Sequence, residues 1–235
     1  MDITAKLKVL DQIYSLYNYF TGGWDYACQR YCAYCCTSKV TMTTLEGYKI
    51  VEHCTSHDKP DLFEKLKSGS CRSRFQPKIT TNKLTELYAQ KDDMPDEKDD
   101  SFSGKCPLLV NNECPVYQVR PFGCRCFVSI HSCQKKGYAE IDPILVTINT
   151  LFLQFIEHVD SQGCSGNLTD MLMFMQSKAN QQAYKSNRIV KPAGALVANH
   201  PIKVLFIPPE HKNRVKPVLQ ALYNIKVPGE QAGFD

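Results

Sequence analysis

Four cysteines lie within nine consecutive residues near the start of the chain: Cys28, Cys32, Cys35 and Cys36. The C-x3-C-x2-C spacing lets the first three sulfurs converge on one point without help from distant chain. Cys36 cannot easily join its neighbour Cys35 on the same metal, so we expect it to reach a second site or to bridge. Four thiolates this close would repel one another without a cation, and a disulfide between adjacent cysteines is strained. The spacing therefore favours a metal site.

A second group of four cysteines follows in residues 106–127: Cys106, Cys114, Cys124 and Cys126. Eight thiols are enough for two four-coordinate centres or one polynuclear centre, and zinc and iron both accept four thiolates. The second group is spread singly along the chain, unlike the paired knuckles of a zinc finger. We therefore predict that both groups converge on one shared site, with all eight cysteines as candidate ligands. Three isolated cysteines are interpreted as buried or incidental thiols: Cys54, Cys71 and Cys164.

Other side chains near the clusters have two interpretations each. Arg30, Arg120 and Arg125 would lower the pKa of nearby thiols and offset the charge of a thiolate-bound metal, although ordinary salt bridges are the commoner use of arginine. His131 and Cys133 follow at a distance that can reach the site, but a single histidine is more often a core or surface residue.

Composition limits the class of protein. The 235 residues can bury a hydrophobic core without disulfides, and the first twenty predict an amphipathic helix and not a secretory signal. No apolar run approaches the roughly 18 residues that cross a bilayer. We therefore expect a cytoplasmic protein with reduced thiols and no membrane partner. The net charge of +4 is small and interspersed, which argues against nucleic acid and leaves a metal ion as the expected partner. The acidic run at 91–101 is interpreted as a solvated connection, not a calcium loop.

The hydrophobic pattern predicts one mainly helical α+β domain over residues 1–235, a compact cysteine-rich metal-binding domain with a C-terminal strand and helix. Residues 26–127 form the cysteine-rich region, with a polar insertion at about 72–105, and residues 143–235 form a helical and strand-helix part. A first helix ends at Gly22. Further helices are predicted at 44–54, 82–90, 143–160 and 167–184, a strand at 202–207, and a terminal helix that contains Pro217.

Three local signals support these helices. Thr43 and Glu46 have the spacing of a capping box, and Asp142-Pro143 is a favourable start for the helix that follows. Asn167 or Thr169 can cap the helix after it. The methionines in that helix are interpreted as core residues and not as metal ligands: Met171, Met173 and Met175.

Two segments together resemble a known family. They are "C-Q-R-Y-C-A-Y-C-C…T-T-L-E" and "C-P-L-L…C-P-V-Y-Q-V-R-P-F-G-C-R". Residues 26–127 are similar in these motifs to the YkgJ-type zinc- or iron-chelating domain, the C-x3-C-x2-C-C family, which includes the catalytic part of flagellin lysine-N-methylases. The resemblance implies that the family's R-P and C-R pairs fall on Arg120-Pro121 and Cys124-Arg125, and that Cys126 and Cys133 lie outside the pattern. The implied ligands are Cys28, Cys32, Cys35, Cys36, Cys106, Cys114 and Cys124.

Three functions follow from these observations. The first is a metal-binding protein that holds zinc or iron, the iron as single ions or as an iron-sulfur cluster, through cysteine thiolates. The second, implied by the resemblance, is an iron-sulfur-dependent methyltransferase with a protein substrate. The third starts from "C-Q-R-Y-C-A-Y-C", which also fits the three-cysteine motif of radical S-adenosylmethionine enzymes. Such enzymes use a barrel of repeated strands and helices, which the following residues do not predict. The sequence leaves open whether the protein is an enzyme.

Overall fold

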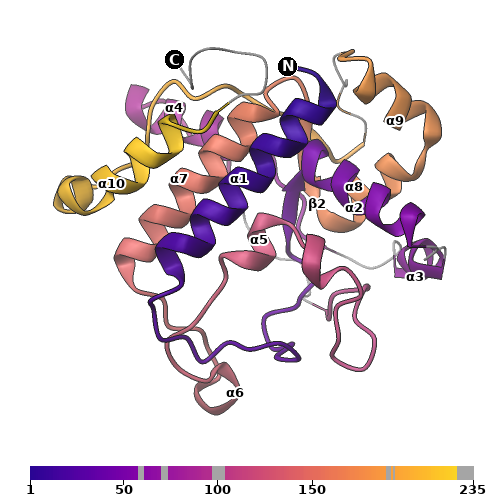
Figure 1. Cartoon of the computed structure of the whole chain (residues 1–235), viewed down its shortest axis with the longest axis horizontal. Helices are drawn as coiled ribbons and strands as arrows, with labels where there is room; N and C mark the ends of the chain where they lie inside the picture. Colours follow the sequence, from indigo (N-terminus) through magenta and orange to yellow (C-terminus); the bar gives the residue numbers. More distant parts are fainter. Residues whose placement is uncertain (58–60, 70–73, 97–103, 189–191, 193, 227–235) are drawn as a thin grey trace.

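Two long helices pack against each other through the middle of the protein (Figure 1). The computed structural model describes residues 1–57, 61–69, 74–96, 104–188, 192 and 194–226. Helix α1 (Ile3–Thr21) begins where the Asp2 carboxylate accepts the Ala5 amide at 2.8 Å. Helix α7 (Pro143–Val159) begins where Asp142 accepts the Ile144 amide at 2.9 Å. Both helices are amphipathic, and burial of their facing apolar sides stabilises the pair.

Further helices cover the two sides of this pair (Figure 1). On one side, α4 (Thr81–Gln90) and α10 (Lys212–Tyr223) pack on α7. On the other, α2 (Thr44–Ser56) packs on α8 (Leu168–Gln176), which also contacts α3 (Asp61–Gly69) and α9 (Lys178–Lys185). The hydrophobic core therefore runs from α10 through α7, α1 and α2 to α8.

A small antiparallel sheet joins distant parts of the chain. Its order is β1 (Thr41–Thr43), β2 (Cys164–Asn167) and β3 (Val197–Ala198). Met42 pairs with Gly166, and Ser165 pairs with Val197. The protein is thus mainly helical with a small three-stranded sheet, as expected for an α+β fold.

Most of the predicted helices are confirmed. The capping box at the start of α2 forms, with Glu46 accepting the Thr43 amide at 2.9 Å. The predicted helix at 167–184 begins after Asn167, as expected, but it is broken at Ser177 into α8 and α9. Met171 and Met175 are fully buried, which confirms their use in the core. The structure also contains helix α3, which the sequence analysis did not predict.

The predicted strand at 202–207 is wrong. These residues run beside α7, where the side-chain amide of Gln154 donates to the Val204 carbonyl at 2.8 Å and accepts the Phe206 amide at 3.0 Å. One buried glutamine thus takes the place of a neighbouring strand. The third strand is formed earlier, by β3. The terminal helix is confirmed as α10, with Pro217 inside it.

The cysteine-bearing loops gather beyond one end of α1, in the lower part of Figure 1. Three short helices lie within these loops: η1 (Tyr117–Val119), α5 (Phe122–Arg125) and α6 (Cys133–Lys136). A further 3-10 turn, η2 (Pro209–His211), precedes α10. In the acidic run, residues 91–96 are exposed, as expected for a solvated connection, and residues 97–101 lie outside the described part. In the described part of the chain, no helix combines the length and apolar character needed to cross a membrane.

Candidate metal centre

Backbone hydrogen bonds bring the two cysteine clusters together. The Cys106 amide donates to the Cys36 carbonyl at 2.9 Å, and Thr37 forms an antiparallel bridge with Lys105. The start of the second cluster therefore lies beside the end of the first. Tight turns then set the direction of the later thiols, because the Tyr117 amide returns to the Cys114 carbonyl at 3.1 Å.

Seven of the eight predicted ligands line one cavity of about 150 Å³. They come from four separate stretches of chain and include every cysteine that the family resemblance implies: Cys28, Cys32, Cys35, Cys36, Cys106, Cys114 and Cys124. Apolar side chains, among them Val40, Leu108 and Leu168, complete the wall. A thiol-lined cavity with an apolar wall strengthens any electrostatic interaction inside it.

Cys126 is the eighth predicted ligand, and the structure places it elsewhere. Its thiol is buried in the hydrophobic core, with Sγ 3.8 Å from the Gly123 carbonyl oxygen. Burial raises the pKa of this thiol to about 12. The Cys126 carbonyl accepts the side-chain amide of Asn149 on α7 at 3.0 Å. Its surroundings are those of a packed core thiol.

The isolated cysteines match their interpretation where the structure describes them. Cys54 and Cys164 are buried at 1% and 0% exposure, in the core. Cys71 lies outside the described residues. All eleven described cysteines are free thiols.

The cluster thiols influence one another. Cys35 and Cys36 are hydrogen bonded through their side chains, and this bond is the main cause of a lowered pKa at Cys36 and a raised pKa at Cys35. Burial raises the pKa of Cys106 to about 11. Burial also raises the pKa of Cys124, with further contributions from Cys106 and Cys114. Cys35, Cys106 and Cys124 therefore resist ionisation unless a cation compensates the charge.

The donor set suits a soft cation. Thiolate sulfur is the preferred ligand of zinc and of iron-sulfur clusters. Among the described residues, no three side chains of histidine, cysteine, aspartate or glutamate are already spaced as the ligands of one ion. The lining thiols would therefore have to turn inward to bind. Cys32 is exposed and the other lining thiols are half-buried, so rotation about their side-chain bonds is open to them.

Glu46 anchors the segment that carries Cys124. Its buried carboxylate accepts the Tyr14 hydroxyl at 2.8 Å and the Phe122 amide at 2.6 Å, in addition to its capping bond. One side chain thus joins α1, α2 and α5. The sequence identifies Glu46 as a cap, and no local pattern signals its contacts with Tyr14 and Phe122.

The arginines near the clusters serve the scaffold. Arg120 stacks on the Tyr117 ring at 3.8 Å, and Arg125 donates to the carbonyls of Arg120 and Gln118 at 2.9 and 2.6 Å. Arg30 forms an exposed ion pair with Glu113 at 2.9 Å. Arg30 thus forms the expected kind of ion pair, whereas Arg120 and Arg125 hold rings and carbonyls and also line the cysteine cavity.

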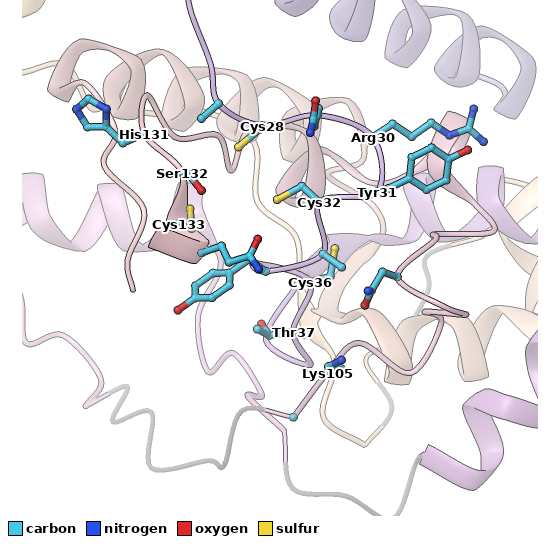
Figure 2. A pocket seen from close by; sticks show the side chains of 17 residues that line it. Cys28, Arg30, Tyr31, Cys32, Cys36, Thr37, Lys105, His131, Ser132 and Cys133 are labelled. Atoms are coloured by element: carbon cyan, nitrogen blue, oxygen red, sulfur yellow. The ribbon is translucent and has the colours of Figure 1, made fainter. Parts of the chain in front are cut away.

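A larger hollow of about 720 Å³ lies outside the cysteine cavity. Figure 2 shows Cys28, Cys32, Cys36 and Cys133 lining this hollow, with His131 at its margin. His131 instead approaches Glu140, with 3.6 Å between Nε2 and a carboxylate oxygen. Cys133 is thus a thiol at the site beyond the eight predicted ligands. In the sequence, only its short distance from the second cluster indicates that it can reach the site.

Comparisons of the chain with models of known protein families, with curated proteins and with solved structures found no match. The resemblance to the C-x3-C-x2-C-C family therefore rests on its cysteine motifs. The function has to be argued from the site itself.

Proposed function

We propose that this protein binds zinc or iron through clustered cysteine thiolates. The observation that carries the proposal is the convergence of seven thiols from four chain segments on one cavity. Free cysteine normally packs as a small apolar side chain, as Cys54 and Cys164 do here. Seven thiols around one space repel when ionised, and a bound cation removes that repulsion.

The loops that carry these thiols have little regular structure of their own. Short turns and single backbone hydrogen bonds hold them, such as the bond from Cys106 to Cys36. A metal that joins several loops would supply the missing cross-links, and its binding energy would stabilise this end of the fold. The proposal agrees with the family resemblance, in which the same cysteines chelate zinc or iron.

Thiol protection tests the proposal. Protein purified under reducing conditions is treated with an alkylating reagent before and after metal removal by a chelator, and the modified cysteines are mapped by mass spectrometry. We expect the seven cavity thiols to be protected with metal and modified without it. Cys54 and Cys164 are the internal controls, because burial shields them in both states. Equal modification of the cavity thiols in both states would exclude metal coordination.

The outer hollow favours a second, catalytic candidate. Its volume of about 720 Å³ lies in the range of small-molecule sites, and it adjoins the thiols of Cys28 and Cys32. An iron-sulfur-dependent methyltransferase acting on a protein substrate would use such a space for its methyl donor. The radical S-adenosylmethionine alternative has less support, because the described strands form an antiparallel sheet and not a barrel of repeated strands and helices. An anaerobic absorption spectrum separates these candidates from zinc binding, because iron-sulfur clusters are coloured and zinc is not.

A further inference from the structure

The outer hollow and the cysteine cavity share one wall. Three thiols line both spaces: Cys28, Cys32 and Cys36. Cys133 lines the hollow alone, whereas Cys106 lines the cavity alone. The volume of about 720 Å³ is enough for a ligand of drug size. A molecule in the hollow therefore lies directly against thiols of the proposed metal centre.

The ionisable groups around the hollow, apart from its thiols and tyrosines, are basic. Among the described residues that line it are Arg30, Lys105 and His131, and none is an aspartate or a glutamate. Figure 2 shows these three side chains spread around the hollow, with the cysteines between them. Uncharged amides, such as those of Gln29 and Gln134, belong to the same lining. A lining with charge of one sign attracts a ligand of the opposite sign, here an anion.

These basic side chains are open to an incoming anion. Lys105 is exposed. Arg30 pairs with Glu113 at 2.9 Å, and His131 approaches Glu140 at 3.6 Å, but all four side chains are at least 42% exposed. Exposed ion pairs contribute little free energy. The anionic group of a ligand can therefore replace either carboxylate at small cost.

Tyr31 is held in an unusual backbone conformation at the hollow. Its φ is 72°, in the left-handed region that a bulky residue rarely adopts, and the residue is 61% exposed. Such conformations cluster at ligand-binding and active sites. The guanidinium of Arg30 lies 5.2 Å from the centre of the Tyr31 ring, and Tyr34 adds a second exposed ring to the lining. Aromatic faces beside positive charges suit an anion that itself carries an aromatic ring.

We propose that the outer hollow binds a small organic anion that carries an aromatic ring. Its carboxylate or phosphate group is held by the basic side chains, and its ring lies against Tyr31. This inference goes beyond the proposed function, because it concerns the hollow and not the cavity. The bound anion lies against the shared thiols, and in metal-loaded protein it lies beside the metal. The basic lining disfavours a lysine side chain, the substrate that the resemblance to lysine-N-methylases implies.

Probes that share one ring and differ in charge test the proposal. The full chain is purified under anaerobic reducing conditions, its metal content is measured, and it is titrated with benzoate, phenyl phosphate, benzamide and benzylamine. Saturation-transfer NMR follows binding. We expect the two anions to bind, and the tighter of them tells a carboxylate site from a phosphate site. Neutral benzamide and cationic benzylamine should bind roughly tenfold more weakly or worse.

Two pairs of variants locate the anion. Lys105→Gln should weaken binding of the tighter anion roughly threefold to tenfold, the effect of one charge in a partly solvated site. Lys135→Gln removes the same charge from α6 outside the lining, and should change binding less than about twofold. Tyr31→Leu should weaken binding roughly threefold. Tyr138→Leu is its control, because Tyr138 is 59% exposed at the same end of the molecule and does not line the hollow.

Several results would overturn the proposal. Tighter binding of benzylamine than of benzoate, or equal binding of all four probes, would contradict an anion site. Equal effects of Lys105→Gln and Lys135→Gln would place the anion outside the hollow. All four substituted side chains are exposed, so the variants should fold, which circular dichroism checks, and either pair alone decides.

The metal content separates this proposal from the proposed function. A folded, metal-loaded sample that binds neither anion would remove the anion site and leave metal binding intact. A folded sample without zinc or iron that binds the anions, with the expected effects of the variants, would uphold the anion site and contradict the proposed function.

Discussion

At the scale of single residues, Glu46 holds the start of the short helix that carries Cys124. Its carboxylate accepts bonds from Thr43, Tyr14 and Phe122, which belong to three different elements. Glu46→Gln replaces one acceptor oxygen with an amide donor that faces other donors. We expect a loss of roughly 2 to 4 kcal/mol in the free energy of unfolding, the range for buried charged hydrogen bonds with one partner left unsatisfied.

Urea unfolding of metal-free protein measures this loss, and zinc affinity should fall in parallel because α5 carries Cys124. Glu52→Gln is the matched control, since Glu52 lies on the exposed side of the same helix and bonds only weakly to Tyr48, at 3.2 Å. It should change stability by less than about 0.5 kcal/mol. Equal effects of the two substitutions would contradict the anchoring role.

We expect the free energy of unfolding to depend on pH through the buried His158. Its Nδ1 accepts the Ile202 amide at 3.1 Å, and burial lowers its pKa below the ordinary value of 6.5. Below about pH 6.5, His158 takes up a proton in the unfolded chain but stays neutral in the folded protein. Stability is therefore full above about pH 6.5 and falls as the pH drops toward the folded pKa.

Urea unfolding of metal-free protein between pH 7 and 5 measures this effect. In His158→Asn the side-chain oxygen can still accept the Ile202 amide without titrating, so the slope in this range should be shallower. His200, whose pKa is also lowered by burial, leaves a residual slope. Identical pH profiles for the unmodified protein and His158→Asn would show that His158 does not contribute.

At the scale of elements, Gly163 shows how closely the end of α7, the start of α2 and β2 approach. A Cβ atom there would lie 2.0 Å from Thr44 Oγ1 and 2.5 Å from a carboxylate oxygen of Asp160. These two groups are buried and hydrogen bonded to each other at 2.5 Å. We expect Gly163→Ala to cost about 3 kcal/mol or more, because neither group can move without losing partners.

Thermal unfolding measures this cost. Gly23→Ala is the control, since a Cβ atom there meets nothing within 4 Å, and it should change stability by less than about 1 kcal/mol. A Gly163→Ala protein as stable as Gly23→Ala would show that the three elements are less tightly packed than described.

The same elements show what the sequence can predict. Helices with strong local signals, such as the Thr43–Glu46 capping box and Asp142-Pro143, were predictable because neighbours in sequence determine them. The sheet was not, because the residues of β2 carry no alternating apolar pattern and their partners are distant. The apolar run at 202–207 lacks a strand because Gln154 satisfies its backbone, which is a tertiary effect.

The candidate site could likewise be predicted only where neighbours in sequence determine it. The crowding of thiols at 28–36 indicated their convergence, because short loops cannot separate them. The choice between Cys126 and Cys133 was beyond the sequence, since it depends on which side of the chain after α5 faces the core. Proximity along the chain favoured Cys126, whereas in the structure Cys126 belongs to the hydrophobic core and Cys133 lines the outer hollow.

At the scale of the whole molecule, the helical core and the cysteine end are largely separate. The buried core is built around α1, α2, α7 and α8, whereas six of the cavity thiols lie on loops beyond α1 and Cys124 lies on the short helix α5. Metal removal should therefore loosen the loops and leave the helices formed. We expect hydrogen exchange to quicken at residues 27–37 and 104–116 while α1 and α7 stay protected. Uniform loss of protection would show that the metal controls the entire fold.

Metal content of the purified chain tests the central claim most directly. The protein is produced without an affinity tag, purified anaerobically away from added metals, and analysed for all transition elements together with protein concentration. We expect at least one zinc or iron per chain, retained through gel filtration, because thiolate sites bind these metals tightly. A fully folded protein with neither zinc nor iron would contradict metal binding by this cysteine cluster.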